Sequence, residues 1–219
     1  TESWLVVATR ENAKLYFGFK DKITKEQLSK LEEQSETEKD IMASLLMGVD
    51  AKVGDIYLIK AGLIHAIGEG CTIVEVQEPT DFTIQPERWC GDYHISENEE
   101  YIGLDKDTAL SAINYDIFGQ DAISYASVSP KTVIDTENYK KQALITYEDT
   151  TCFAENKHVL SNGGSFTMDF GPCVYIVTDG EAVITGENYE KKIVRGDYFF
   201  LPYSAKNKFT VTSKTGATL

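Results

Sequence analysis

The sequence predicts a mainly β fold made of two jelly-roll β-sandwich bodies, with a small helical insertion in the first body. Three observations lead to this fold class. Short strand-like runs alternate with glycine- and proline-containing turns along most of the chain. Helical spacing of apolar residues is largely confined to residues 24–48 and a shorter stretch at 105–117. A turn-and-strand phrase near residue 54 recurs near residue 196, which favours two bodies built on one plan.

The first two strand-like runs lie at residues 4–9 (WLVVAT) and 14–19 (KLYFGF). Each run is short and rich in aromatic or β-branched residues, as strands usually are. The four residues between them, Arg10 to Ala13, can form a turn. We therefore predict an antiparallel hairpin made of these two strands.

The helical insertion is expected at about residues 24–48, where the period of the apolar residues changes. Thr24 is followed three residues later by Gln27, a capping-box signature that predicts the start of a helix. A second helix is predicted to begin at Thr37, with Gly48 as the cap just past its end. The many charged side chains of this insertion are expected to form a solvated face.

Residues 53–81 are the stretch around which we expect the first body to be organised. Residues 56–59 and 72–76 predict two strands, joined by a glycine-rich turn. His65 lies between these strands. By itself it fits either a metal ligand or a half-buried strand residue with a backbone partner, because a metal site needs three or four ligands.

The remainder of the chain predicts an acidic loop at residues 97–100, a short helix at 105–117 and a polar connection at 127–147. Six further strand candidates follow, separated by turn residues: 153–160, 164–170, 173–178, 182–185, 192–201 and 208–213. Closely spaced strands of this kind predict a sandwich or a small barrel. We accordingly place the first domain at residues 1–126 and the second at 127–219.

The internal echo consists of a Gly-Asp pair that opens a strand in each half. Gly54-Asp55 precedes Ile-Tyr-Leu-Ile, and Gly196-Asp197 precedes Tyr-Phe-Phe-Leu. The second copy has no counterpart of His65. The first body is therefore the better candidate for chemistry.

Composition restricts the class of partner. The chain of 219 residues has 21 Lys and Arg against 35 Asp and Glu, a formal net charge of −14. This balance argues against nucleic acid and anionic membranes as partners. An anionic small-molecule substrate would need a local cluster of positive charge. No apolar run approaches the roughly 20 residues of a transmembrane helix.

The cysteines and the first residues bear on the location of the protein. Four scattered cysteines without a C-x-x-C pair favour free thiols and a reducing cytoplasm. The chain opens with Thr1 and shows neither an initiator Met nor a signal peptide, so we expect it to be recorded from part-way along. The oligomeric state stays open.

One phrase of the central stretch resembles a known family. Residues 60–68, KAGLIHAIG, together with Thr1-Glu2-Ser3-Trp4, Glu75-Val76-Gln77 and Asp81, resemble the class I mannose-6-phosphate isomerases. These are zinc-dependent double cupins that interconvert mannose 6-phosphate and fructose 6-phosphate. Lys60 stands where that family more usually has proline. The resemblance spans essentially the whole chain and implies a cytoplasmic enzyme with a sugar phosphate as substrate.

The resemblance also implies a metal site. In the family a single zinc is held by His and Glu side chains in the first barrel, and two of these ligands map to Glu2 and His65. A carboxylate oxygen and an imidazole nitrogen are ordinary zinc ligands. The family's remaining His-bearing segment lies upstream of the Thr-Glu-x-Trp phrase. This chain therefore presents only part of the site.

A catalytic arginine of the family falls on Gln85 when counted from Asp81. Glutamine can form hydrogen bonds, but it has no positive charge to stabilise an enediolate. Arg88, three residues further on, substitutes for it only if the strand bulges, because an odd offset on a regular strand points to the opposite face. We therefore expect this chain by itself to be a poor isomerase.

Three hypotheses remain: a zinc-dependent aldose–ketose isomerase, a non-catalytic cupin that binds a sugar or a metal ion, and a β-sandwich interaction module. Zinc content separates the third from the others, and turnover of mannose 6-phosphate separates the first from the second. Of the other polar candidates, His94 could line the barrel mouth, His158 is expected to be exposed, and Cys90 is expected to be a buried thiol.

Overall fold

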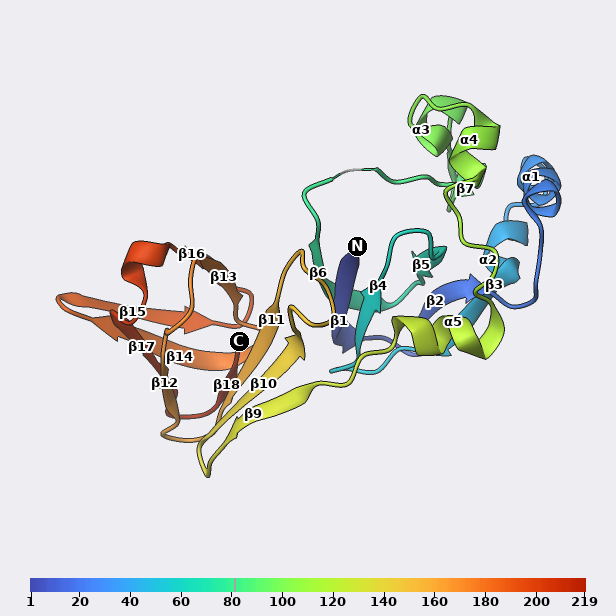
Figure 1. Cartoon of the computed structure of the whole chain (residues 1–219). Helices are drawn as coiled ribbons and strands as arrows, with labels where there is room; N and C mark the ends of the chain where they lie inside the picture. Colours follow the sequence, from blue (N-terminus) through green and yellow to red (C-terminus); the bar gives the residue numbers. More distant parts are fainter. Residues whose placement is uncertain (81) are drawn as a thin grey trace. The chain divides into compact units, whose positions relative to one another are not determined.

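The computed structural model describes residues 1–80 and 82–219, which divide into a first unit, residues 1–128, and a second unit, residues 129–219 (Figure 1). The mainly β fold class is confirmed, with 40% strand and 17% helix. The division falls two residues beyond the predicted domain boundary. Asp81, part of the family phrase, lies outside the described residues.

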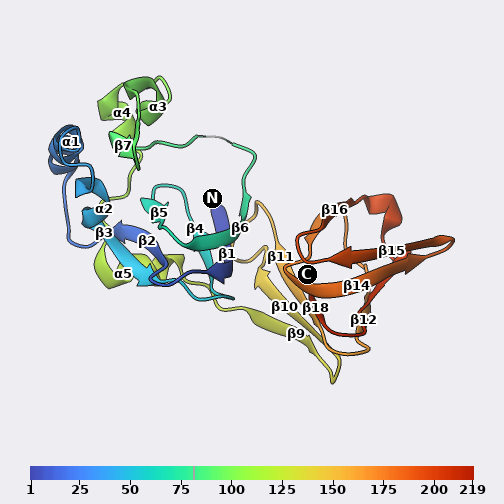
Figure 2. The ribbon, with the colours of Figure 1, turned by 180° about the vertical axis from the view of Figure 1, so that it is seen from behind.

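Two three-stranded antiparallel sheets form the β part of the first unit (Figure 2). One has the order β4-β1-β6 and the other β3-β2-β5. Their bounds are β1 Glu2–Thr9, β2 Lys14–Phe19, β3 Leu46–Asp50, β4 Ile56–Ile59, β5 His65–Ile67 and β6 Cys71–Gln77.

The predicted pairing of β1 with β2 is wrong. β1 and β2 do not form a hairpin, because β4 and β6 occupy both edges of β1 while β3 and β5 occupy both edges of β2. The turn between β1 and β2 instead carries the chain from one sheet to the other. β4 and β6 likewise flank β1 and do not pair with each other.

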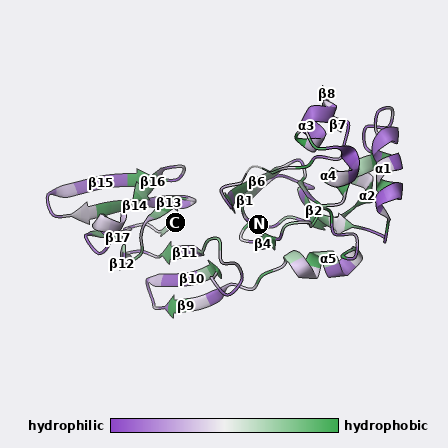
Figure 3. Cartoon of the chain, turned by 45° about the horizontal axis from the view of Figure 1, so that its top comes forward, coloured by the Kyte–Doolittle hydropathy of each residue, from purple (hydrophilic) through white to green (hydrophobic). Residues whose placement is uncertain are grey.

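The helices belong to the first unit. They are α1 Lys25–Gln34, α2 Ile41–Leu45, α3 Glu97–Tyr101, α4 Lys106–Leu110 and α5 Gly119–Ala126, with a short β7 Trp89–Cys90 and β8 Tyr93–His94 between α2 and α3. α1 is largely hydrophilic in colour (Figure 3). In the described part of the chain, none of the helices is long and apolar enough to cross a membrane.

The first predicted helix is confirmed, including its capping box: Thr24 and Gln27 exchange side-chain-to-backbone hydrogen bonds. The second is much shorter than predicted. It ends at Leu45, because Leu46 is extended and Gly48 belongs to β3, so the prediction of Gly48 as a helix cap is wrong.

The acidic residues 97–100, predicted as a loop, lie in α3. The Ser96 side chain accepts from the N–H of the third helical residue and Glu99 reaches back to the Ser96 N–H, which is a second capping box. Of the stretch 105–117, only residues 106–110 are helical, with Asp105 as the N-cap.

One apolar cluster in the interior of the first unit lies between β1, β2, β4 and α5. Alternate residues of β1 point inward and meet residues of β2, β4 and α5, because successive side chains of a strand face opposite sides. The cluster comprises Trp4, Val6, Leu15, Phe17, Ile59, Leu63, Ala122 and Ala126, each at most 3% exposed.

The regular secondary structure of the second unit is almost entirely β-strand. An eight-stranded antiparallel sheet has the order β12-β17-β14-β18-β11-β10-β9, with β15 also on β14, and β13 pairs with β16. The bounds are β9 Lys131–Asp135, β10 Tyr139–Ile145, β11 Glu155–Leu160, β12 Ser165–Thr167, β13 Cys173–Ile176, β14 Asp179–Gly186, β15 Tyr189–Val194, β16 Tyr198–Leu201, β17 Phe209–Thr212 and β18 Ala217–Thr218, with a 3-10 turn at Tyr203–Ala205.

Two sequence predictions for this unit are wrong. Residues 127–147 are not a polar connection, because they contain β9 and β10. These two strands pair antiparallel as a hairpin. The candidate at 192–201 is two strands, because a turn at Gly196, with a φ of 94°, separates β15 from β16.

The internal echo is confirmed at the level of hydrogen bonds. Gly54 and Gly196 both have a φ of 94°. The Asp55 carboxylate accepts from the Lys52 N–H at 3.0 Å, and the Asp197 carboxylate accepts from the Val194 N–H at 2.9 Å. The Gly54 N–H donates to the Val6 carbonyl at 2.8 Å, and the Gly196 N–H donates to the carbonyl of Val177, just past β13, at 2.9 Å. Each unit therefore contains its own copy of this turn.

Candidate functional site

Glu2 and His65 meet inside the first unit. Glu2 is the first residue of β1, and His65 is the first residue of β5, where it pairs with Phe17 of β2. His65 Nε2 lies 2.9 Å from Glu2 Oε1. The Glu2 side chain is 18% exposed and that of His65 is 33% exposed, so the pair lies at a partly open edge of the apolar interior.

The other nitrogen of His65 is held by the backbone. Nδ1 lies 2.6 Å from the Leu63 carbonyl oxygen, which can only accept, so Nδ1 carries a proton and donates. Nε2 is thereby directed at Glu2. This arrangement, with one ring nitrogen bonded to a carbonyl and the other free to act, is usual for metal-binding histidines.

The charges around His65 favour its protonated form in the metal-free chain. Burial lowers the pKa of His65, but the hydrogen bonds to Glu2 and Leu63 and the negative charges of Glu2 and Glu75 outweigh it, so the pKa is raised. An imidazolium is a donor to a carboxylate and cannot bind a metal. A metal ion would therefore have to displace this proton.

Glu75 is a third polar residue at the site that sequence reasoning did not single out as functional. It lies opposite Trp4 in the β1–β6 register and accepts from Trp4 Nε1 at 3.2 Å. The Trp4 ring packs against His65 at 5.2 Å between ring centroids. Burial and the charge of Glu2 raise the pKa of Glu75, while Trp4 and His65 lower it less.

Strand alternation could have identified this face. Glu2 and Trp4 lie on one side of β1, and their register partners on β6 are Gln77 and Glu75. Directly opposite residues of an antiparallel pair share a face. The family phrase Glu75-Val76-Gln77 thus places Glu75 and Gln77 on the face of Glu2, and the apolar Val76 on the opposite face.

The donor chemistry fits zinc, but the number of ligands is short of a complete site. Glu2 supplies a carboxylate oxygen and His65 an imidazole nitrogen, whereas catalytic zinc usually has three protein ligands. Within the described part of the chain, no group of three or more His, Cys, Asp and Glu side chains is placed to hold a metal ion.

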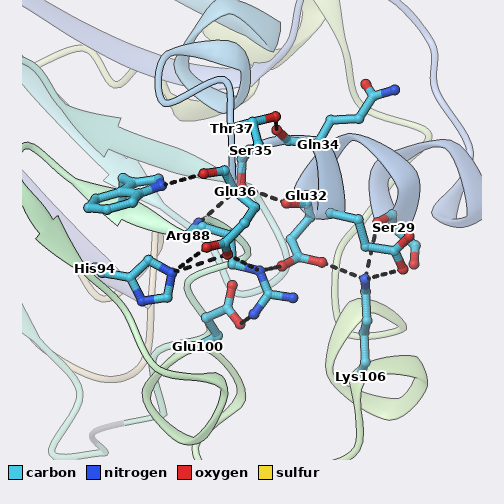
Figure 4. Close-up of polar contacts among 12 residues, drawn as sticks. Ser29, Glu32, Gln34, Ser35, Glu36, Thr37, Arg88, His94, Glu100 and Lys106 are labelled. Atoms are coloured by element: carbon cyan, nitrogen blue, oxygen red, sulfur yellow. Dashed lines mark hydrogen bonds and ion pairs between the residues drawn. The ribbon is translucent and has the colours of Figure 1, made fainter.

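The predicted catalytic candidates lie elsewhere in the first unit. Residues 82–88 contain neither helix nor strand, so the regular strand assumed for the offset between Gln85 and Arg88 does not exist. Gln85 is exposed, and its backbone N–H donates to the Glu100 carbonyl at 2.9 Å. The Arg88 guanidinium is bound to Glu32 and Glu100 among the helices (Figure 4).

Three other expectations are wrong. His94 does not line a barrel mouth, because its Nε2 lies 3.1 Å from both Glu36 carboxylate oxygens in the helical part. His158 is only 5% exposed, within the core of the second unit, and burial first, with Lys141 second, lowers its pKa to about 4. Cys90 is exposed, at the end of the two-residue strand β7.

Comparison with known proteins links the chain to sugar phosphate isomerases. No protein-family model matches it. The chain is 25% identical over 203 residues to the mannose-6-phosphate isomerase ManA of Bacillus subtilis, which covers 93% of this chain and 58% of the relative. It is 22% identical over 202 residues to a putative mannose-6-phosphate isomerase, YvyI, of the same organism, over 92% of this chain and 58% of the relative.

Solved structures show the same fold. The mannose 6-phosphate isomerase of Bacillus subtilis superposes with a TM-score of 0.74 at 20% identity, over 100% of this chain and 63% of that one. A putative mannosephosphate isomerase of Archaeoglobus fulgidus gives 0.65 at 18% identity, over 99% of this chain and 58% of that one. The chain thus has the fold of part of these proteins and spans less than two thirds of their length.

Proposed function

We propose that this chain belongs to a zinc-dependent, double-cupin isomerase that interconverts mannose 6-phosphate and fructose 6-phosphate. The observation that carries the proposal is the Glu2–His65 pair, at 2.9 Å, at the edge of the first unit's interior. Its two members come from the two phrases by which the sequence resembles class I mannose-6-phosphate isomerases. The sequence relatives and the shared fold support the same assignment.

Each polar residue of the site has a role in this proposal. Glu2 and His65 would hold zinc, and bound zinc supplies positive charge that polarises and orients the sugar oxygens. Leu63 fixes the ring of His65 so that Nε2 faces the metal position. Isomerisation moves a proton between neighbouring sugar carbons, and Glu75, whose pKa is raised, is the carboxyl group beside this pair that can take and return it.

Neither of the two candidate residues for stabilising negative charge on the substrate provides a free positive charge. Gln85 has no charge, and Arg88 is already paired with two carboxylates, so neither offers a free cation to a sugar phosphate or to an enediolate. We therefore propose that the chain by itself is a poor isomerase. The same observation favours a second candidate function, a non-catalytic cupin that binds a sugar or a metal ion.

Zinc binding tests the metal site directly. Calorimetric titration of the chain with zinc should show one site, and Glu2→Gln and His65→Gln should each weaken it at least tenfold, as expected when a ligand is lost. Glu69→Gln, an exposed carboxylate of the same unit, is the matched control and should bind like the unaltered chain. Equal binding by all four proteins would refute the site.

Turnover separates the two candidate functions. The chain, saturated with zinc, should convert mannose 6-phosphate slowly in a coupled assay, and Gln85→Arg should raise the rate if the missing charge is the deficit. Removing one well-placed donor typically costs about a hundredfold in rate. Full activity of the unaltered chain would contradict the proposed deficits. Zinc binding without any turnover, even with Gln85→Arg, would favour the non-catalytic cupin.

A further inference from the structure

Two carboxyl groups are completely buried where the helices of the first unit meet (Figure 4). Glu32 lies on α1 and Glu100 on α3, and both are 0% exposed. Between and beside them lie Arg88 and Lys106, the latter the first residue of α4. This cluster is outside the proposed metal site and has no part in the proposed reaction.

The two carboxyl groups do not share the positive charge equally. Glu32 contacts both cations, since its Oε1 lies 2.6 Å from Arg88 Nε and its Oε2 is paired with Lys106 Nζ. Glu100 has an ion pair with Arg88, from Nη1 to Oε2 at 2.9 Å, and Glu32 is another charged neighbour. Lys106 is further divided, because it also pairs with Glu33 at 3.0 Å.

Part of the cluster is left without hydrogen bonds. Glu100 Oε1 and the Tyr101 hydroxyl are buried and have no hydrogen-bond partner among the described residues, and the two oxygens of Glu32 are held by ion pairs with Arg88 and Lys106. A buried oxygen that carries full charge and lacks a partner is costly. A proton on Glu100 would remove that charge and turn Oε1 into a donor.

The electrostatics agree with this geometry. Burial, and then the neighbouring Glu32, raise the pKa of Glu100 to about 8, and the charges of Arg88 and Lys106 offset this only in part. Two carboxyl groups that share a buried site seldom both ionise. At neutral pH one proton therefore remains on the pair.

We propose that the helical arm of residues 97–110, which contains α3 and α4, is docked on α1 by a single proton shared between Glu32 and Glu100, and that losing this proton releases the arm. Release would expose Tyr101 and Leu110, which pack in the docked state with Leu28 of α1 in one apolar cluster. It would also free residues 82–88, which the Gln85 N–H anchors to the Glu100 carbonyl.

Other charged groups face the same contact and have to be separated from the pair. Lys25 of α1 pairs with Asp107 of α4 at 2.5 Å, and His94 pairs with Glu36 at 3.1 Å. Burial raises the pKa of Glu87, on the segment that leads to Arg88. Lys39 also pairs with Asp92, in the turn between β7 and β8, at 3.2 Å. Lys25, Asp107, Lys39 and Asp92 pair across the surface, where salt screens them.

The sign of the pH effect follows from linkage. The docked arm holds a proton on a group with a pKa of about 8, whereas the released arm would have an ordinary glutamate, with a pKa near 4.5. Docking is therefore strongest below pH 4.5 and is lost as the pH rises through 8. Between pH 6 and 8 the opening constant should increase by up to about tenfold per pH unit.

Hydrogen exchange of the arm measures this opening. After correction for the intrinsic exchange rate, the amides of residues 97–110 should lose protection between pH 6 and 8 in the unaltered chain. Glu100→Gln imitates the protonated carboxyl group, because it accepts from Arg88 and donates toward Glu32, and it should give protection that does not change with pH. The proposal is overturned if Glu100→Gln loses protection as the unaltered chain does.

Two control variants isolate the pair. Glu33→Gln removes the exposed carboxylate that is paired with Lys106, and His94→Gln removes the imidazole that is paired with Glu36. Both variants should keep the pH dependence of the unaltered chain. If His94→Gln abolishes it, His94 is the responsible group and the proposal is wrong. A carbon-13 titration of Glu100 in the unaltered chain needs no variant: an apparent pKa near 8 supports the proposal, and one below 5.5 overturns it.

Discussion

The two units build the same turn and the same antiparallel ladder, yet they place different side chains on it. In the first unit Glu2 lies opposite Ile59, four residues after Asp55. In the second unit Cys173 lies opposite Leu201, four residues after Asp197. The position that presents a carboxylate to His65 in one unit therefore presents a thiol in the other.

The next inward positions of the ladder are alike. Trp4 and Tyr175 are equivalent, and both are buried aromatic residues, 2% and 7% exposed. The positions on the opposite face of the strand differ in exposure. Ser3 is fully buried, whereas its counterpart Val174 is 61% exposed. Both ladders thus have a buried aromatic residue at the position of Trp4 and Tyr175. The position of Glu2 and Cys173 and the position of Ser3 and Val174 differ widely in side-chain chemistry or exposure.

The histidines differ in the same way. His65 lies at the open edge of the first unit with a carboxylate at its Nε2. His158 is enclosed in the second unit, where its Nδ1 is hydrogen-bonded to the Tyr139 hydroxyl at 2.9 Å and its ring stacks on Phe166 at 4.2 Å between ring centroids. One is suited to chemistry and the other to packing. This comparison teaches that the site is set by a few side chains and not by the ladder.

The largest expected effect comes from removing the shared aromatic position. Trp4→Ala and Tyr175→Ala should each destabilise their own unit by about 3–5 kcal/mol, because each empties a buried aromatic site. Denaturant titration, with hydrogen exchange to assign the loss to a unit, measures both. Tyr198→Ala is the control, since Tyr198 is 78% exposed and should change stability by less than about 0.5 kcal/mol. A small effect of Tyr175→Ala would break the equivalence.

The pH dependence of the two histidines should have opposite signs. The pKa of His158 is lowered to about 4 by burial, so its contribution is present above pH 6.5 and lost as the pH falls toward 4, by about 3 kcal/mol. His158→Phe, which keeps a stacking ring, should abolish this loss in acid unfolding curves of the second unit. The pKa of His65 is raised, so its contribution disappears as the pH rises.

An equal and intermediate effect is expected at the two turn glycines. Gly54 and Gly196 share a φ of 94°, and a Cβ at either position would meet no atom of the described residues within 4 Å. Only backbone strain then opposes alanine, so Gly54→Ala and Gly196→Ala should each cost about 1–2 kcal/mol. Thermal unfolding of each variant measures this. Costs that differ by more than about 1 kcal/mol would show that the surroundings of the turns are not equivalent.

Local signals in the sequence predicted local structure well. The capping box at Thr24 and Gln27 and the Gly-Asp turns are satisfied within a few residues of themselves. The pairing of strands is not local, so sequence neighbours β1 and β2 suggested a hairpin that the occupied edges of both strands prevent. Residues 97–100 looked like a loop because their charge masked the second capping box, at Ser96.

The candidate site could be predicted only through the family phrases. These phrases singled out Glu2 and His65, which the fold brings to 2.9 Å, although no short-range pattern links them. Glu75 was overlooked, since its place beside Trp4 depends on the register of β1 and β6. Arg88 is a catalytic candidate in the sequence because it follows Gln85 by three residues. Its pairing with Glu32 and Glu100 could not be predicted, because these carboxylates are distant in sequence from each other and lie in stretches expected to be exposed.

The smallest expected effect tests whether the two turns are alike in energy as well as in geometry. Asp55→Ala removes the acceptor of the Lys52 N–H, and Asp197→Ala removes that of the Val194 N–H, at 3.0 and 2.9 Å. Each should cost about 1 kcal/mol, the usual net value of one hydrogen bond. Asparagine at either position keeps the acceptor oxygen and should restore most of the stability, as denaturant titration would show. If alanine is costly at Asp55 and neutral at Asp197, the second turn is held by its glycine and its strand partner alone, and the shared phrase then preserves the shape of the turn without preserving its stability.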